Sequence, residues 1–392
     1  MEEKNTPFSF KKEMSAETFL FPIIFLALFG VFVYYMGLAN ALNTIMNTAY
    51  RLLIDTVLYI TAVCVIMGAV SALFSEFGFV SLANRLLRPL MRPIFGLPGA
   101  AALGVVTTFL SDNPAILALT DDHRFRQYFR KYEFPALTNL GTAFGMGLIV
   151  CTYMYSLSPK MGVGLGAAVG VGLIGATIGS IVSTRIMLAF TKKYFGDTWD
   201  EEYTSGPKYN TPKDMRPIRS GGIGSHAIAA VLEGGHSGVK MGVSIIPGVL
   251  VICTIVLMLI NGPSESGEYT GAAYEGIRVL PVLAEKIDFV LKPLFGFTSP
   301  EAIGIPVTAL GAAGAALSLT ANLTTNKLIG PGDIAVFTAM CMCWSGYLST
   351  HASMMDSLGY KGLIGKAIAS HTIGGIVAGV AAHWIYVLVS MI

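Results

Sequence analysis

Nine stretches of apolar residues, each long enough to cross the hydrocarbon core of a lipid bilayer, dominate this 392-residue chain. A segment that spans a membrane must satisfy its own backbone hydrogen bonds, so stretches of this length are expected to be helices. The composition agrees, because only 13% of the residues are charged, whereas a typical soluble domain has about 25%. The sequence therefore predicts an all-α membrane protein that crosses the bilayer several times.

Two of the nine stretches, 97–120 and 297–321, are interrupted at their middle by turn-forming residues. The interruptions are Ser111-Asp112-Asn113-Pro114 and Gly311-Ala312-Ala313-Gly314. Clusters of arginine and lysine flank the first stretch on both sides, and the positive-inside rule then favours a re-entrant hairpin over a span. The other seven stretches are predicted transmembrane helices, near residues 18–38, 50–75, 134–156, 161–190, 240–260, 333–357 and 363–390.

An internal repeat relates the two hairpins. Shifting the sequence by 200 residues without gaps gives 11 identities over residues 91–120, among them Gly104/Gly304 and Thr108/Thr308, where biased composition predicts about three. Each half then holds one hairpin and three crossings, and an odd number of crossings inverts the second half relative to the first. Inverted-topology repeats with helix breaks at mid-membrane depth are typical of secondary transporters, which hold substrate between the halves.

The domain boundaries follow from this repeat. Residues 1–49 form an N-terminal tail and the first transmembrane helix, and 50–191 form the first repeat. A cytoplasmic loop with an interfacial segment covers 192–236, and the second repeat covers 237–392. Twenty of the 26 lysines and arginines then lie on or near one side. The expected location is the bacterial inner membrane, with the N-terminus in the cytoplasm.

The first hairpin tip supplies three candidate site residues, Ser111, Asp112 and Asn113. An ionisable side chain at mid-membrane depth is costly, which favours a role for Asp112 in binding substrate or a coupling ion. All three residue types also cap helix N-termini well, so a purely structural role for Asp112 stays open.

Two further helices carry clusters of polar residues next to glycine. Serine and threonine in membrane helices often bond only their own backbone, but the group that follows Ser345 is too dense for that role alone. These helices are predicted to line the substrate site through Thr138, Asn139, Thr142, Ser345, Ser349, Thr350 and His351.

Other function classes find little support in the sequence. The net charge is only +2, and the Arg-rich, aromatic segment 123–133 is typical of an interfacial helix, so nucleic acid is not an expected partner. His371 and His383 lie twelve residues apart without a matching ligand set, so no metal site is predicted. No nucleophile–base pair or cofactor motif occurs, and the chain is not expected to be an enzyme.

The repeat of a hairpin followed by a broken helix resembles the nucleoside-recognition, or gate, domain family, which includes the concentrative nucleoside transporters. The matching segments are 237–261, 301–319 and 334–353. The resemblance implies that substrate lies between the hairpin tips and the broken helices and that transport is an elevator-like movement. It also implies coupling to Na⁺ or H⁺, for which Asp112 is the candidate contact, and it leaves a homo-oligomer open.

The hairpin tips depart from that family. The nucleoside transporters carry Gln-Thr-Glu in the first hairpin and Glu-Phe in the second, whereas this chain has Ser111-Asp112-Asn113 and an acid-free second tip. We therefore expect a secondary active transporter of a small polar metabolite, nucleoside-like by resemblance. A small carboxylate or amino-acid-like solute is the alternative substrate. A membrane scaffold without transport, in sporulation or envelope assembly, is the alternative function, and membrane lipid is the expected surrounding.

Overall fold

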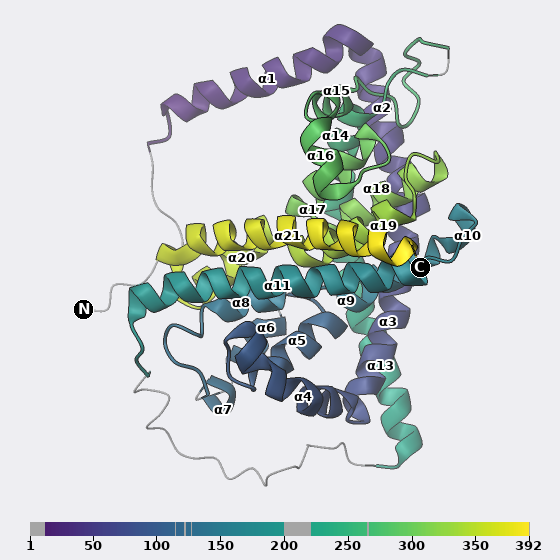
Figure 1. Ribbon diagram of the computed structural model, residues 1–392. Coiled ribbons are helices and arrows are strands. Elements are labelled where there is room, and N and C mark those ends of the chain that lie inside the picture. Colours follow the sequence, from purple (N-terminus) through teal and green to yellow (C-terminus); the bar gives the residue numbers. More distant parts are fainter. Residues whose placement is uncertain are drawn as a thin grey trace.

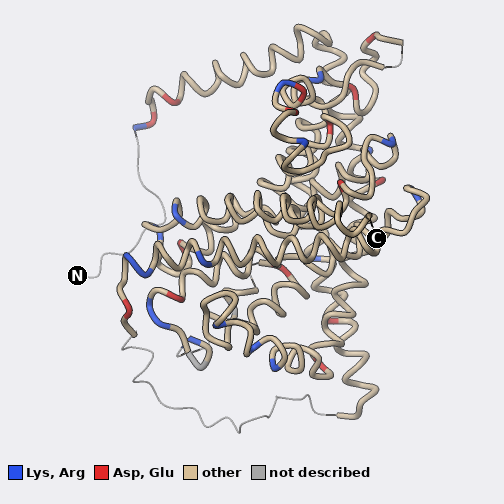
Figure 2. Tube along the Cα trace, in the orientation of Figure 1, with Lys and Arg blue, Asp and Glu red and all other residues tan. Residues whose placement is uncertain are grey.

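A computed structural model of the chain describes residues 12–113, 115–120, 123–126, 128–199, 221–264 and 266–391. Throughout these residues the regular structure is helical and no strand occurs. Within the described residues, six helices are long and apolar enough to cross a membrane. Charged residues are sparse along these helices (Figure 2). The chain is an all-helical, multi-pass membrane protein, as the hydropathy pattern predicts.

The six long helices are Ala16–Met36 (α1), Leu38–Glu76, Ala136–Met161, Gly166–Phe195 (α11), Ile223–Ile260 and Lys361–Ser390. Leu38–Glu76 consists of α2 (Leu38–Arg51), η1 (Leu52–Val57) and α3 (Leu58–Glu76). Ile223–Ile260 consists of α13 (Ile223–Ser244), η3 (Gly248–Cys253) and α14 (Thr254–Ile260), and the last helix contains η5 (Lys361–Leu363) and α21 (Ile364–Ser390). The seventh predicted span, 333–357, is divided into α19 (Pro331–Trp344) and α20 (Tyr347–Ser357).

The first helix of each repeat is longer than its hydropathy predicts. Helix α13 begins at Ile223, so residues 223–236, expected in a loop and interfacial segment, are helical. Residues 200–220 of the expected loop lie outside the described residues. Helix α2 likewise extends the expected span 50–75 back to Leu38. Polar residues lower the hydropathy of both extensions, yet one face of each packs against protein, which window averages do not detect.

Helices α3 and α13 cross with their backbones in contact. A methyl group added at Gly68 would overlap the carbonyl oxygen of Gly234, and one added at Gly238 would overlap that of Cys64. The pairing of 68 with 234 and of 64 with 238 shows that the two helices are antiparallel. Small residues permit this close approach in membrane proteins. The crossing joins the two repeats (Figure 1).

A second close pair is formed by α11 and α21, which lie side by side and run across α3 and α13 (Figure 1). A methyl group added at Gly374 would meet the carbonyl oxygen of Gly179 at 2.7 Å, and one at Gly175 would meet that of Ala378 at 2.7 Å. The broken helices α8 (Ala136–Thr142), α9 (Gly147–Ser156) and α19 pack against this pair.

Each of the two interrupted stretches forms two helical arms. The first has α5 (Ala101–Leu110) and α6 (Ala115–Thr120), and the second has η4 (Pro300–Ile303), α17 (Gly304–Gly311) and α18 (Ala313–Thr325). A methyl group at Gly104 would touch Ile116, and one at Gly304 would touch Leu319 at 3.1 Å, so each pair of arms folds back on itself. The turns lie at the predicted interruptions, whereas the depth of the hairpins in a bilayer stays a prediction.

Shorter helices surround these elements. Before the first hairpin lie α4 (Phe79–Leu90) and η2 (Met91–Phe95), and before the second lie α15 (Val279–Lys286) and α16 (Asp288–Phe295). Helix α7 (His123–Arg126) follows the first hairpin, and α10 (Ser158–Met161) ends the first broken helix.

Candidate functional site

Both broken helices are interrupted at equivalent positions of the repeat. Met146 lies between α8 and α9 in the left-handed region with φ 56°, and Gly346 lies between α19 and α20 with φ 68°. These two residues are 200 positions apart. Ser345 also has a positive φ, of 20°. A break in a membrane helix frees backbone N–H and C=O groups, which persist only where other groups satisfy them.

Asn113, at the tip of the first hairpin, hydrogen-bonds a backbone carbonyl group that the break in the second broken helix leaves free. Its side chain is 1% exposed, and its Nδ2 donates to the carbonyl oxygen of Ser345 at 3.0 Å and to Oγ1 of Thr350 at 3.1 Å. Its Oδ1 lies so close to Gly145 that a methyl group there would overlap it. One amide side chain therefore contacts the breaks of both broken helices.

The second hairpin meets the same break from the other side. The N–H of Gly346 donates to the carbonyl oxygen of Ala309 at 3.0 Å. A methyl group at Gly346 would lie 3.2 Å from the carbonyl oxygen of Gly311. The segment Ser345–Gly346 is thus the point at which both hairpin tips converge.

The base of each hairpin is tied to the start of the following broken helix by a buried acid that the sequence analysis missed. Glu133 accepts hydrogen bonds from the Arg92 side chain and from the Arg130 N–H, the latter at 2.9 Å. Asp333 accepts from the Thr298 N–H at 3.0 Å and from the Gly330 N–H at 2.9 Å. Glu133 and Asp333 are 200 positions apart, so a comparison of acidic residues between the two repeats could have identified them.

Asn139 and Thr138 do not join the hairpin tips. Nδ2 of Asn139 donates to Ser183 Oγ at 2.9 Å and to Ser370 Oγ at 2.8 Å. Ser183 in turn bonds Nδ1 of His371 at 2.8 Å, and Nε2 of His371 bonds the Cys343 carbonyl. A carbonyl only accepts, so the proton of His371 is on Nε2. Asn139 thus ties α8 to α11 and α21, and Thr138 bonds Pro135 O at 2.8 Å.

Thr142 and His351 are fully buried polar residues that keep unused hydrogen-bonding capacity. Thr142 Oγ1 and both ring nitrogens of His351 have no hydrogen-bond partner within the part of the chain that the structure describes. The His351 ring lies 4.6 Å from the His371 ring, centroid to centroid. Unpaired buried polar groups are costly, and neither residue lines the cavity described below.

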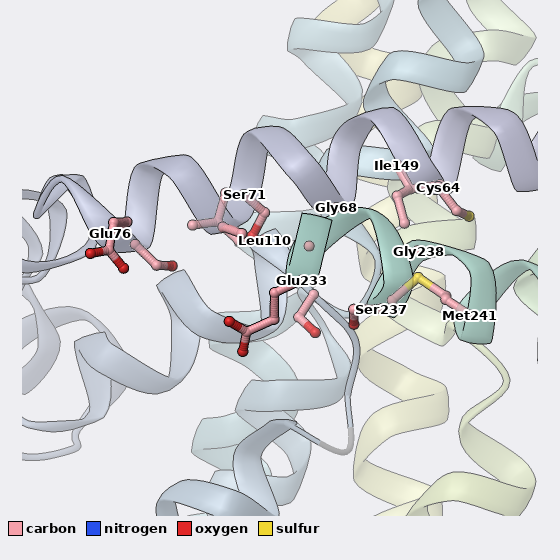
Figure 3. A pocket seen from close by; sticks show the side chains of 14 residues that line it. Cys64, Gly68, Ser71, Glu76, Leu110, Ile149, Glu233, Ser237, Gly238 and Met241 are labelled. Atoms are coloured by element: carbon pink, nitrogen blue, oxygen red, sulfur yellow. The ribbon is translucent and has the colours of Figure 1, made fainter. Parts of the chain in front are cut away.

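An inner cavity of about 380 Å³ reaches the first hairpin tip between α3 and α13. Besides apolar residues, its lining includes four serines and two glutamates: Ser71, Ser75, Ser111, Ser237, Glu76 and Glu233. Figure 3 shows Glu76 and Ser71 on α3, and Glu233 and Ser237 on α13, along the cavity. Ser111 is therefore accessible, whereas the neighbouring Asp112 accepts the Asn113 N–H at 2.7 Å through Oδ1.

The ten predicted residues thus divide into separate groups. Ser111, Asp112, Asn113, Ser345 and Thr350 lie together at the convergence of the hairpin tips. The side chain of Ser349 lies outside the described part of the structure. Among the residues described, no group of three His, Cys, Asp or Glu side chains could hold a metal ion.

Comparisons with known proteins show which solved structures share this fold. No protein-family model matches this sequence, and no curated protein matches it. A solved structure of a CNTnw variant in an outward-facing state has a TM-score of 0.53 and 14% identity, covering 94% of this chain and 84% of that one. CNTnw in an inward-facing substrate-bound state has a TM-score of 0.51 and 14% identity, covering 82% and 74%. The chain has the fold of the concentrative nucleoside transporters.

Proposed function

We propose that this protein is a secondary active transporter that moves a small polar metabolite across the bacterial inner membrane, with its N-terminus in the cytoplasm. The observation that carries the proposal is the convergence of both hairpin tips on the break at Ser345–Gly346. A scaffold without cargo has no need of two broken helices and two helical turns whose free backbone groups meet at one buried point.

The inner cavity supports the same function. Its lining includes Glu76, in the last turn of α3, and Ser111 at the first hairpin tip, so the cavity lies next to the site. The likeness to CNTnw, which is solved in inward-facing and outward-facing states, supports alternation between two accessible states. In an elevator-like movement, the hairpins and broken helices would shift as a body against α3 and α13.

Uptake by the purified protein in liposomes tests this function. Radiolabelled uridine, an amino acid and a dicarboxylate would each be offered under an inward Na⁺ gradient, an inward H⁺ gradient and no gradient. We expect accumulation of at least one solute that collapses when the driving gradient is dissipated by an ionophore. Empty liposomes and the Gly346→Val variant, which blocks the meeting of the second tip with the break, are the controls. Equal uptake by the variant and the wild-type chain would contradict the proposed site.

A further inference from the structure

Helix α4, which precedes the first hairpin, lies at the edge of the molecule (Figure 1). At 3.6 residues per turn, its most exposed apolar side chains fall on one stripe. The stripe consists of Phe79, Leu82, Leu86 and Leu90, which are 45 to 65% exposed. Leu87 lies on another face and packs against the core. An exposed apolar stripe on a helix that packs along one other face is typical of a helix that lies in the membrane interface.

Two arginines lie on α4 outside this apolar stripe. Arg85 and Arg88 are exposed, and neither forms an ion pair with another described residue. The next arginine along the chain differs, since Arg92 donates to the buried carboxylate of Glu133. The stem of Arg88 lies against Gly99, where an added methyl group would overlap it. Arg88 is therefore held at the base of the first hairpin with its charge facing the surroundings.

The second repeat has acids at the equivalent positions. The offset of 200 aligns Arg85 with Glu285 and Arg88 with Asp288. Both acids have a cation nearby, because Glu285 is 3.9 Å from Arg278 and Asp288 is 3.6 Å from Lys292. Positions just beyond keep their chemistry, in the pairs Arg92/Lys292, Pro93/Pro293 and Phe95/Phe295. A charge required by the packing of the repeat would keep its sign, so the sign at these two positions depends on the side of the membrane.

The chemistry of the partner follows from the arginines and the stripe together. In the proposed topology α4 lies at the cytoplasmic surface, and the equivalent helices α15 and α16 lie at the opposite surface. The cytoplasmic leaflet contains anionic lipids, which attract arginine near the surface. A guanidinium group binds the oxygens of a phosphate through paired hydrogen bonds. A phospholipid supplies both a phosphate for the arginines and acyl chains for the stripe, whereas a soluble phosphate leaves the stripe uncovered.

We propose that Arg85, Arg88 and the apolar stripe of α4 form a binding site for an anionic phospholipid of the inner leaflet. The choice of leaflet rests on the proposed orientation, whereas binding itself does not depend on transport. Because Arg88 packs on Gly99, a lipid bound here holds α4 against the base of the first hairpin and stabilises the folded protein.

Thermal unfolding in detergent with added lipid tests the site. The wild-type protein would be titrated with phosphatidylglycerol, which is anionic, or with phosphatidylcholine, which is zwitterionic. We expect phosphatidylglycerol to raise the unfolding temperature at a much lower concentration. The variant Arg85→Gln/Arg88→Gln should need at least about tenfold more of it for half of the rise, since each arginine near an anionic surface contributes about fivefold. Arg85→Lys/Arg88→Lys keeps the charge and should keep most of the effect.

A matched control comes from the second repeat. Lys286→Gln/Lys292→Gln removes two cations from α15 and α16 and should leave the phosphatidylglycerol dependence as in the wild-type protein. Arg85→Gln alone leaves the packing of Arg88 on Gly99 intact and should cost about fivefold, which separates lost binding from misfolding. Native mass spectrometry gives an independent count, and the wild-type chain should retain more phosphatidylglycerol than the double arginine variant.

Three outcomes would overturn the proposal. The first is an equal phosphatidylglycerol dependence in the wild-type protein and in Arg85→Gln/Arg88→Gln. The second is an equal loss in the Lys286→Gln/Lys292→Gln control, which would indicate a general response to charge. The third is an equal rise with inorganic phosphate or glycerol 3-phosphate, which would show a site for soluble phosphate. None of these readouts needs transport, so a failure of the lipid site and a failure of the transport function are seen separately.

Discussion

At the scale of single residues, Asn113 has the most direct link to function, because its amide contacts both helix breaks. Replacing Asn113 with alanine would leave the Ser345 carbonyl without its side-chain donor, at a cost of about 1 to 3 kcal/mol. We expect Asn113→Ala to fold, to unfold at a lower temperature and to lose most of its uptake. Asn326→Ala, an exposed asparagine near the end of α18, is the control for both measurements, and normal uptake by Asn113→Ala would contradict the role of the tip.

Asp112 could have either of two roles: it caps the hairpin turn, or it contacts the coupling ion. Its Oδ1 accepts the Asn113 N–H at 2.7 Å, and the side-chain oxygen of asparagine accepts the same bond without the charge. We expect Asp112→Asn to keep the thermal stability of the wild-type protein and to lose the dependence of uptake on the Na⁺ or H⁺ gradient. Unchanged gradient-driven uptake across the accessible pH range would show that Asp112 only caps the turn.

At the scale of helices, the α3–α13 crossing should tolerate no added side-chain atom on its inner face. A methyl group at Gly234 would overlap Gly68 O, whereas one at Gly235 would lie 3.7 Å from Val65. We expect Gly234→Ala to lower the yield of folded protein and its unfolding temperature. Gly235→Ala should be neutral or stabilise the helix by about 0.5 to 1 kcal/mol. Similar unfolding temperatures for the two variants would contradict the close crossing.

At the scale of the whole molecule, the inverted repeats predict that the two cavities face opposite sides of the membrane. Ser75 lines the inner cavity, and Thr325 lines a second cavity, the outer one, between η1, the end of α9, α10 and α18. In sealed inside-out vesicles, an impermeant thiol reagent should label Ser75→Cys, and in right-side-out spheroplasts it should label Thr325→Cys. Labelling of both variants from the same side would contradict the inverted topology, and the exposed residue Asn326, as cysteine, provides a reference for the outer side.

The sequence alone determined the class of fold, the repeat and the positions of the hairpin turns. These features are carried by local patterns: runs of apolar residues, turn-forming residues at mid-stretch and a constant offset of 200. Polar residues next to glycine predicted an interruption in one further helix of each half, and the structure places these breaks at Met146 and Gly346, 200 positions apart. Glu133 and Asp333 could have been found in the same way, by comparing residue types across the repeat.

The tertiary structure alone decided which polar side chains meet. Asn113 and Asn139 look alike in the sequence, yet Asn113 bonds Ser345, 232 residues away, and Asn139 bonds Ser183 and Ser370 on α11 and α21. The difference depends on the face that each side chain presents once the helices have packed, and helix packing is set by contacts between distant segments. For the same reason, the cavities whose linings include Ser111 and Ser318 could be identified only after folding had brought α3, α9 and the hairpins together.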